Sequence, residues 1–287
     1  MLSFGHIHIH DEKVTCMPCS ETDYAFLRRF ILERSENVLD PLRDDLFEAR
    51  LYRLWQRCGM NGLDELVKRL RYAIDPALEQ SVVEAMTINE TSFFRDHTPF
   101  ELMRSKLLPE LIQRRESKRR LRFWSAACSS GQEAYSLAML LRQHFPLLSG
   151  WDIQILGTDI NSAMVCRAQS GRYQRMEVNR GLPARFLLQY FRRDGDEWEI
   201  TSELRGLCQF QQRSITQSWP FFERYDGILL RNALFYFSTE TQKRILRRTH
   251  RTLEPDGFLL LGSSEQTSMP ELWQPVLDCN TCYYRPC

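Results

Sequence analysis

Residues 121–140, LRFWSAACSSGQEAYSLAML, constrain the fold of this chain more than any other stretch. Residues 121–127 are apolar and aromatic, which is typical of a strand buried on both faces of a parallel sheet. The small residues 127–131 predict a tight turn, and apolar residues then recur at helical spacing from Tyr135. A strand, a tight turn and a helix form the opening unit of a nucleotide-type α/β fold, in which the start of the helix offers unpaired N–H groups to a ligand.

The turn itself argues against a dinucleotide cofactor. Gly131 is its single glycine, whereas the fingerprint G-x-G-x-x-G needs three. A nicotinamide-dependent dehydrogenase is therefore disfavoured. S-adenosylmethionine has no pyrophosphate and does not need the same close backbone approach. A βα turn that binds no ligand has the same local pattern, so the turn alone leaves both interpretations open.

Composition excludes several classes of protein. The 287 residues carry a formal net charge of +1, which argues against a nucleic-acid partner. No apolar run approaches the ~20 residues of a membrane span, and the N-terminus lacks the apolar core of a signal peptide. Nine cysteines, several of them inside apolar patterns, favour reduced thiols. We therefore expect a cytoplasmic protein without membrane insertion.

Patterning divides the chain into four regions. They are a flexible leader (1–19), a helical N-terminal domain (20–88), a linker that contains the motif NETSFFRD (89–120) and a large α/β domain (121–287). Histidines and cysteines near the two ends have the composition of metal ligands: His6, His8, His10, Cys16, Cys19, Cys279 and Cys282. We favour an unstructured leader and a C-terminal strand, and expect no metal.

The helical domain is predicted to contain about four helices between residues 23 and 86. Its breaks are Asp40-Pro41, residues 59–62 and Asp75-Pro76. Basic residues gather on two of these helices: Arg50, Arg53, Arg57, Lys68, Arg69 and Arg71. A solvated charged face is the favoured interpretation, and a docking surface for an acidic helical partner is the alternative.

The motif at residues 89–96 places Phe93 and Phe94 beside polar side chains. Polar groups next to an aromatic wall suit a ligand site. The alternative is an interdomain hinge whose phenylalanines pack in the seam. Residues 99–112 are predicted to be helical, with a kink or restart at Pro109.

Alternating strands and helices in the α/β domain predict a mostly parallel, doubly wound sheet. After the first unit, the expected strands are residues 152–157, 225–230, 258–261 and 276–284, with a turn at 254–257. Residues 172–212 are predicted to be an insertion. It should contain a short helix at 185–190 and a small antiparallel sheet with strands at 197–200 and 207–211.

Asp159 follows the second strand, where an acid commonly holds a ribose diol. It lies 28 residues after Gly131, which a helix of this length accommodates. The alternative role is the N-cap of a helix over residues 162–168, and Asp159 is compatible with both.

Five motifs in this order resemble the CheR family of chemotaxis-type protein-glutamate O-methyltransferases. They are NETSFFRD, FWSAACSSGQEAYSLAM, GTDIN, RNALFYF and LEPDGFLLLGSSE, and the resemblance runs from about Asp23 to Tyr284. It implies an α/β Rossmann-like methyltransferase sheet with an all-α N-terminal domain and a small inserted antiparallel β-subdomain. The implied partner is the cytoplasmic domain of methyl-accepting chemoreceptors, and we expect a monomer.

The resemblance also implies site residues. S-adenosylmethionine, whose product is S-adenosylhomocysteine, should be bound by Asn89, Thr91, Arg95, Ala127, Gly131, Glu133, Asp159, Ser214, Ile215, Arg231 and Asn232. Glu133 matches the family's cofactor-binding acid, and Asp159 the ribose acid. Arg95 and Tyr236 match residues that line the methyl-transfer site, and no metal is implied.

This chain departs from the family pattern in three places. The usual Gly-Glu-Glu-Pro-Tyr is Gly-Gln-Glu-Ala-Tyr at residues 131–135, which keeps the second acid. Ser214 and Ile215 stand where the family has Asn-Leu beside the adenine. The turn within residues 192–198 is short, whereas a longer loop accompanies docking of a receptor's C-terminal peptide. We therefore expect an enzyme that does not depend on this peptide.

The proposed chemistry needs no general base, because a glutamate with a pKa of about 4.3 is already ionised near neutral pH. A site that excludes water and aligns oxygen, methyl and sulfur then supplies most of the rate. Phe93, Phe94 and Tyr236 are expected to form the wall of this site. Arg95 is expected to orient the acceptor, and the Gly131 turn to admit the methionine portion. A protein that binds the cofactor as a sensor or scaffold without transferring the methyl group is the alternative function.

Overall fold

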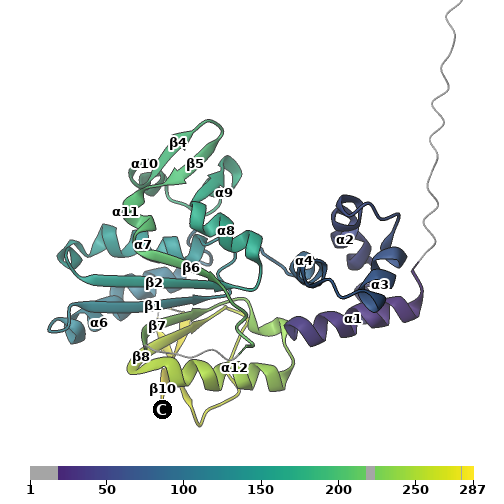
Figure 1. Cartoon of the computed structure of the whole chain (residues 1–287). Coiled ribbons are helices and arrows are strands. Elements are labelled where there is room, and N and C mark those ends of the chain that lie inside the picture. The colour runs from purple at the N-terminus through teal and green to yellow at the C-terminus, as the bar shows by residue number, and fades with distance from the viewer. Residues whose placement is uncertain (1–18, 218–223, 279) are drawn as a thin grey trace, which may run out of the picture. The chain divides into compact units, whose positions relative to one another are not determined.

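The computed structural model describes residues 19–217, 224–278 and 280–287. The chain forms two compact units (Figure 1). Among the described residues, one unit contains those up to Ile31 and Asp40–Met86, and the other contains Leu32–Leu39 and those from Thr87 onward. The candidate metal ligands His6, His8, His10, Cys16 and Cys279 lie outside the described residues.

The first unit is helical, as predicted. Its elements are α1 (Glu21–Ser35) as far as Ile31, the 3₁₀ turn η1 (Pro41–Arg43), α2 (Asp45–Arg57), α3 (Leu63–Tyr72) and α4 (Pro76–Met86). Leu27, Leu51 and Leu66 are fully buried at its centre. The side chain of Asp40 caps η1 by accepting from the N–H of Leu42.

Several basic residues of this unit contact acceptors within it. Arg50 donates to the carbonyl of Met86 at 2.9 Å. Lys68 pairs with Asp64 at 3.2 Å, one helical turn away on α3. Arg69 and Arg71 pair with Asp75 and Asp23. Because these basic side chains contact acceptors of their own unit, the contacts favour a charged face over a docking surface.

The second unit is built on a seven-stranded sheet with the order β6-β2-β1-β7-β8-β10-β9. The strands are β1 (Arg120–Ala126), β2 (Asp152–Asp159), β6 (Cys208–Gln212), β7 (Tyr225–Leu230), β8 (Leu253–Leu261), β9 (Trp273–Asp278) and β10 (Thr281–Pro286). Strand β1 pairs in parallel with β2 and β7, and β10 is antiparallel to β8 and β9. The predicted doubly wound, mostly parallel sheet is confirmed.

Helices cover both faces of this sheet. They are α5 (Thr98–Leu102), the π-helical segment η2 (Met103–Leu107), α6 (Leu108–Arg115), α7 (Gln132–His144), the 3₁₀ turn η3 (Pro146–Leu148), α8 (Ser162–Ser170), the 3₁₀ turn η4 (Leu234–Tyr236) and α12 (Thr239–Thr252). Alternate residues of β1 enter different cores, because successive side chains of a strand point to opposite faces. Phe123 packs with α5 to α8, and Trp124 packs on the side of α12.

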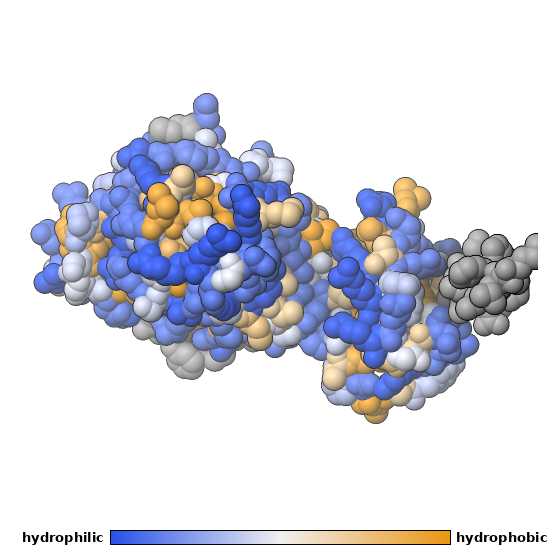
Figure 2. Space-filling model, turned by 90° about the horizontal axis from the view of Figure 1, so that it is seen from above, coloured by the Kyte–Doolittle hydropathy of each residue, from blue (hydrophilic) through white to orange (hydrophobic). Residues whose placement is uncertain are grey.

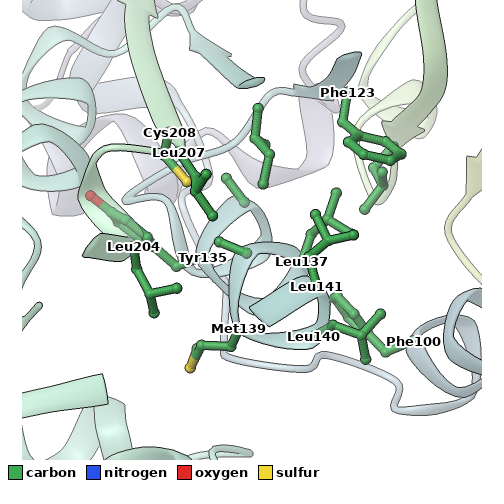
Figure 3. Close-up of a cluster of buried hydrophobic side chains, with 14 of the residues drawn as sticks. Phe100, Phe123, Tyr135, Leu137, Met139, Leu140, Leu141, Leu204, Leu207 and Cys208 are labelled. Carbon is green, nitrogen blue, oxygen red and sulfur yellow. The ribbon is translucent and has the colours of Figure 1, made fainter. Parts of the chain in front are cut away.

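Helix α7 lies deep in the first of these cores. Tyr135, Leu137, Leu140 and Leu141 are all buried, and Figure 3 shows their side chains directed at different neighbours. Phe123 of β1 packs in the same cluster. A helix that is apolar on most sides must be enclosed, so the start of α7 is fixed relative to the sheet.

The insertion folds as a separate three-stranded antiparallel sheet with the order β3-β5-β4. Its elements are β3 (Arg172–Gln174), α9 (Arg175–Asn179), α10 (Ala184–Tyr190), β4 (Phe191–Asp194), β5 (Glu197–Ile200) and α11 (Ser202–Arg205). The prediction that residues 207–211 belong to this sheet is wrong. Strand β6 instead pairs in parallel with β2 at the edge of the large sheet, where Cys208 and Phe210 face the core.

Three further predictions are corrected or refined. Residues 276–284 form no single strand, because β9 and β10 pair as an antiparallel hairpin. Residues 254–257, predicted to be a turn, instead lie within β8, at a point where its pairing with β7 is irregular. Pro109, which has no N–H to donate, is the second residue of α6, and η2 precedes the restarted helix.

Hydrophilic residues dominate the face of the surface seen in Figure 2, and hydrophobic residues are confined to limited areas. Within the described residues, no helix is long and apolar enough to cross a membrane. The cysteines in these parts of the chain are free thiols.

Candidate active site at the carboxyl edge of the sheet

The predicted site residues follow the carboxyl ends of neighbouring parallel strands. Asp159 ends β2, Ala127 follows β1, Ser214 follows β6 and Arg231 follows β7. Strand β1 lies between β2 and β7, so the chain order reverses here. Open α/β sheets bind ligands at such a switch point.

The turn between β1 and α7 has an unusual backbone. Ala127, Ser129 and Gly131 have φ angles of 58°, 49° and 89°. The N–H of Cys128 donates to the carbonyl of Thr158 at 2.9 Å and fixes the turn to β2. Backbone strain of this kind persists only where the surroundings hold it, and it is common at ligand sites.

Gly131 is required by packing as well as by its φ angle. A Cβ atom at this position would lie 2.8 Å from the Cβ of Ala168 and 3.1 Å from the ring of Phe210. The glycine therefore lets the start of α7 approach α8 and β6. Cys128, in the same turn, is fully buried, and this desolvation raises the pKa of its thiol well above the ordinary value.

Asp159 is buried and joins two loops. Its Oδ2 accepts from the N–H of Ser129 at 2.7 Å, and its Oδ1 accepts from the N–H of Asn161 at 2.9 Å. The alternative role as a helix cap is wrong, because Asn161 caps α8 by accepting from the N–H of Met164 at 3.1 Å. The carboxylate of Asp159 therefore contacts the loop after β1 and the loop after β2.

Glu133 and Arg231 form a buried ion pair. Nη1 of Arg231 lies 3.0 Å from Oε2 of Glu133, and their side chains are 2% and 13% exposed respectively. Oε1 of Glu133 accepts from the hydroxyl of Ser125 at 2.7 Å. Nη2 of Arg231 donates to the carbonyl of Arg95 and to Asp96, each at 2.8 Å. Arg231 thus connects α7 to the NETSFFRD motif.

The rest of that motif is tied to the β1–α7 turn. The hydroxyl of Ser129 donates to the carbonyl of Asn89 at 2.8 Å, and the hydroxyl of Thr87 donates to Oδ1 of Asn89 at 3.1 Å. Thr91 is half-buried. Nη1 of Arg95 donates to the carbonyl of Glu90 at 3.0 Å, which folds the side chain back over its own motif.

Phe93 and Phe94 are not an open wall. Phe93 is fully buried, with edge-to-face contacts to Tyr173 and Phe191 at centroid distances of 5.0 and 5.6 Å. Phe94 stacks on Phe186 at 5.2 Å. The predicted wall is therefore wrong for these two rings. They anchor the motif to the inserted subdomain, and aromatic pairs of this geometry stabilise such contacts.

Glu265 organises the loop after β7, a role that the sequence did not reveal. Its buried carboxylate accepts from the N–H groups of Asn232, Leu234 and Gly262 at 2.7, 2.7 and 2.8 Å. Asn232 has a φ of 58°. Tyr236 ends the 3₁₀ turn of this loop and packs against Phe235 at a centroid distance of 4.3 Å.

Ser214 and Ile215 lie beyond β6 with a different set of neighbours. The hydroxyls of Ser214 and Thr216 are 2.9 Å apart, and Arg248 donates to the carbonyl of Ile215 at 3.0 Å. Both predicted residues are buried. Ser214 and Ile215 thus follow β6, whereas Asp159 ends β2 and Arg231 follows β7.

The acidic side chains at this edge fit a cofactor that is cationic at one end and carries a diol. The buried acids Asp159 and Glu133 can accept from hydroxyls and attract a positive charge. Within residues 19–217, 224–278 and 280–287, no group of three or more histidines, cysteines and acids has a metal-binding arrangement. The sheet and its site define a Rossmann-like α/β domain of the S-adenosylmethionine-dependent methyltransferase class.

Comparison with known proteins places the chain within that class. The family described as CheR methyltransferase, SAM binding domain, matches residues 89–282. Chemotaxis protein methyltransferase 1 of Pseudomonas aeruginosa is 37% identical over 265 residues, which cover 91% of this chain and 96% of the relative. Chemotaxis protein methyltransferase Cher2 of Pseudomonas putida is 36% identical over 91% of this chain and 96% of the relative. This chain belongs to the CheR methyltransferase family, and S-adenosylmethionine is its cofactor.

Proposed function

We propose that this protein transfers a methyl group to glutamate side chains on the cytoplasmic helices of chemoreceptors, forming glutamate methyl esters. Two relatives named chemotaxis protein methyltransferase, each matched over 96% of its length, support a role in chemotaxis. The observation that carries the proposal is the contact of Arg231 with both Glu133 and the carbonyl of Arg95. This contact joins α7, which is proposed to bind the cofactor, to Arg95, which is proposed to orient the acceptor glutamate.

The residues that would hold S-adenosylmethionine surround the carboxyl edge of the sheet. Asp159 would accept from the ribose hydroxyls, and Glu133 would face the cationic portion. Ser214 and Ile215 would lie beside the adenine. The other cofactor contacts in the proposal are Asn89, Thr91, Arg95, Ala127, Gly131, Arg231 and Asn232. When bound, S-adenosylmethionine supplies a methyl group made electrophilic by the positive charge on sulfur.

The protein's own contribution is orientation and exclusion of water. The acceptor carboxylate is ionised near neutral pH, so no side chain has to remove a proton. The acceptor carboxylate would become a neutral methyl ester as the sulfonium became a neutral thioether, so the site would not have to stabilise a new charge. Arg95 would orient the acceptor through its planar fork of donors. If Arg95 bound the carboxylate too tightly before transfer, the barrier to transfer would rise. Tyr236 would supply an apolar wall of the site.

Transfer of labelled methyl from S-adenosylmethionine to receptor cytoplasmic fragments tests this function. The wild type should label glutamates in a form that mild alkali releases, as expected of esters. Arg95→Ala should lower turnover, whereas Arg251→Ala, which removes an exposed arginine of α12, should not. Cofactor binding without any label transfer would favour the sensor or scaffold. Full turnover by Arg95→Ala would refute the role of this arginine.

We extend the proposal to receptors without a C-terminal docking peptide. The β4–β5 hairpin has only residues 195–196 between the paired Asp194 and Glu197, and Gly195 has a φ of 61°. Such a tight turn has no loop with which to enclose a peptide. Receptor fragments with and without their last residues should therefore be methylated at equal rates. A strong preference for the longer fragment would refute this extension.

A further inference from the structure

A short segment of the N-terminal region packs beside the loop that carries Tyr236. We call residues 36–38 the strap. Leu32–Leu39, which includes the strap, belongs to the same compact unit as the sheet, although Ile31 before it and Asp40 after it belong to the helical unit. The strap thus belongs to the second unit, which we also call the catalytic unit, although it is remote in sequence from the other residues of that unit.

The strap forms backbone contacts with two successive residues of the loop. The N–H of Val38 donates to the carbonyl of Tyr236 at 2.8 Å. Asn37 and Phe237 form an isolated antiparallel bridge. These contacts act on the backbone that sets the direction of the Tyr236 side chain.

Glu36 attaches the strap to α12. Its carboxylate accepts from the hydroxyl of Thr241 at 2.9 Å and from the guanidinium of Arg244. Burial acts to raise the pKa of Glu36, but the hydrogen bonds from Arg244 and Thr241 outweigh it and hold the pKa below the ordinary value. Thr241 is in the first turn of α12, where a negative charge is favoured by the helix dipole.

The backbone of Glu36 shows that this attachment works against local preference. Its φ is 63°, in the left-handed region that non-glycine residues rarely adopt. A strained residue persists when surrounding contacts over-determine its conformation. The ion pair and hydrogen bond of the carboxylate are such contacts.

Side-chain burial holds the end of this loop less tightly than its start, where Ala233 and Leu234 are buried. Phe235 is 51% exposed, and Tyr236 is only half-buried. A segment with few buried apolar contacts opens easily. Glu265 holds the start of this loop through Asn232 and Leu234, while the strap contacts its end.

We propose that the strap is a positioning element for methyl transfer, which holds Tyr236 in place through its backbone and is itself fixed by Glu36. The inference rests on the role given to Tyr236 in the proposed function. Glu36 does not touch the reacting atoms in this proposal. Its loss should therefore change the rate of transfer and leave the affinity for the cofactor intact.

The test uses the full chain with Glu36→Ala and Arg244→Gln, which break the same ion pair from either side. Each variant is assayed for kcat and KM with receptor fragments, for S-adenosylhomocysteine affinity by calorimetry, and for hydrogen exchange of the Val38 amide. We expect faster exchange at Val38, kcat lowered about tenfold as for a lost charged hydrogen bond, and unchanged calorimetric affinity. Glu240→Ala, at an 81% exposed glutamate side chain of the same helix, is the control and should match the wild type.

Glu36→Gly distinguishes the effect of the carboxylate contacts from that of the backbone strain. It removes the carboxylate and also relieves the strain, because glycine adopts a positive φ freely. It should lose as much kcat as Glu36→Ala. Wild-type kcat in Glu36→Gly would overturn the proposal, as would faster Val38 exchange with no change in kcat, or unchanged exchange in both ion-pair variants. If even the wild type transfers no methyl group, the proposed function fails instead, and Val38 exchange still reports whether Glu36 holds the strap.

Discussion

Replacing Glu265 with alanine should destabilise the catalytic unit and weaken cofactor binding together. Glu265 is 8% exposed, and its carboxylate accepts from three backbone N–H groups, those of Asn232, Leu234 and Gly262. Alanine leaves all three donors without this acceptor. Asn232 is held at a φ of 58° within the same loop. The conformation in which we propose that it contacts the cofactor should therefore be lost as the loop relaxes.

The size of the effect follows from the number of donors. A buried donor without a partner costs about 1–3 kcal/mol, and the lower end applies because a loop at the edge of a sheet can relax toward water. Three donors then give a loss of about 3 kcal/mol, or a fall in Tm of about 6–12 °C for a domain of this size. Glu265→Gln keeps one acceptor oxygen, so its loss should be about half as large.

Urea denaturation gives the free energy of unfolding, and calorimetry gives the affinity for S-adenosylhomocysteine. We expect the affinity of Glu265→Ala to fall about tenfold or more, because only a fraction of molecules keeps the competent loop. Glu271→Ala removes an exposed glutamate six residues later in the chain and serves as the control. A wild-type denaturation midpoint and affinity in Glu265→Ala would refute the idea that this carboxylate organises the loop.

Three other predictions address separate parts of the unit. Asp159→Ala should weaken S-adenosylhomocysteine binding about 100-fold, as expected for two lost hydrogen bonds to a charged group; unchanged calorimetric affinity would exclude Asp159 from the site. Gly131→Ala should lower the free energy of unfolding by about 2–5 kcal/mol, since it combines a strained φ with overpacking, and a wild-type urea midpoint would contradict this. A hydrogen bond from Arg115 lowers the pKa of Asp256 below its ordinary value of 3.8. The resulting stabilisation is present above that value and is lost as the pH falls through the lower folded-state pKa. Asp256→Asn should flatten this acid limb in unfolding measured between pH 2 and 6, and an unaltered limb would show that other groups cause it.

Periodicity predicted the elements whose pattern is complete within one segment. The buried strand, turn and helix around Gly131 are confirmed, as are the helices of the first unit. The pattern of β6 was also recognised as a strand, but its partner was not. Cys208 and Phe210 alternate with polar glutamines, and this alternation is the same at the edge of a parallel sheet and in a small antiparallel one.

Residues whose role depends on distant partners were harder to predict. Adjacent aromatics at Phe93 and Phe94 indicated an important segment, but not that Tyr173 and Phe191 enclose it. Glu265 lies in a turn of small polar residues, a context typical of an exposed side chain. Its partners include amides 31 and 33 residues away along the chain. Only the fold brings these groups together.

The strap also affects how this protein can be divided into fragments. The chain passes between its two compact units three times, after Ile31, after Leu39 and after Met86. A fragment that begins at Thr87 would include every strand of both sheets and the whole segment that matches the family, residues 89–282. It would lack residues 36–38. The smallest piece expected to methylate efficiently is therefore discontinuous in sequence, and no single cut in the chain can release it.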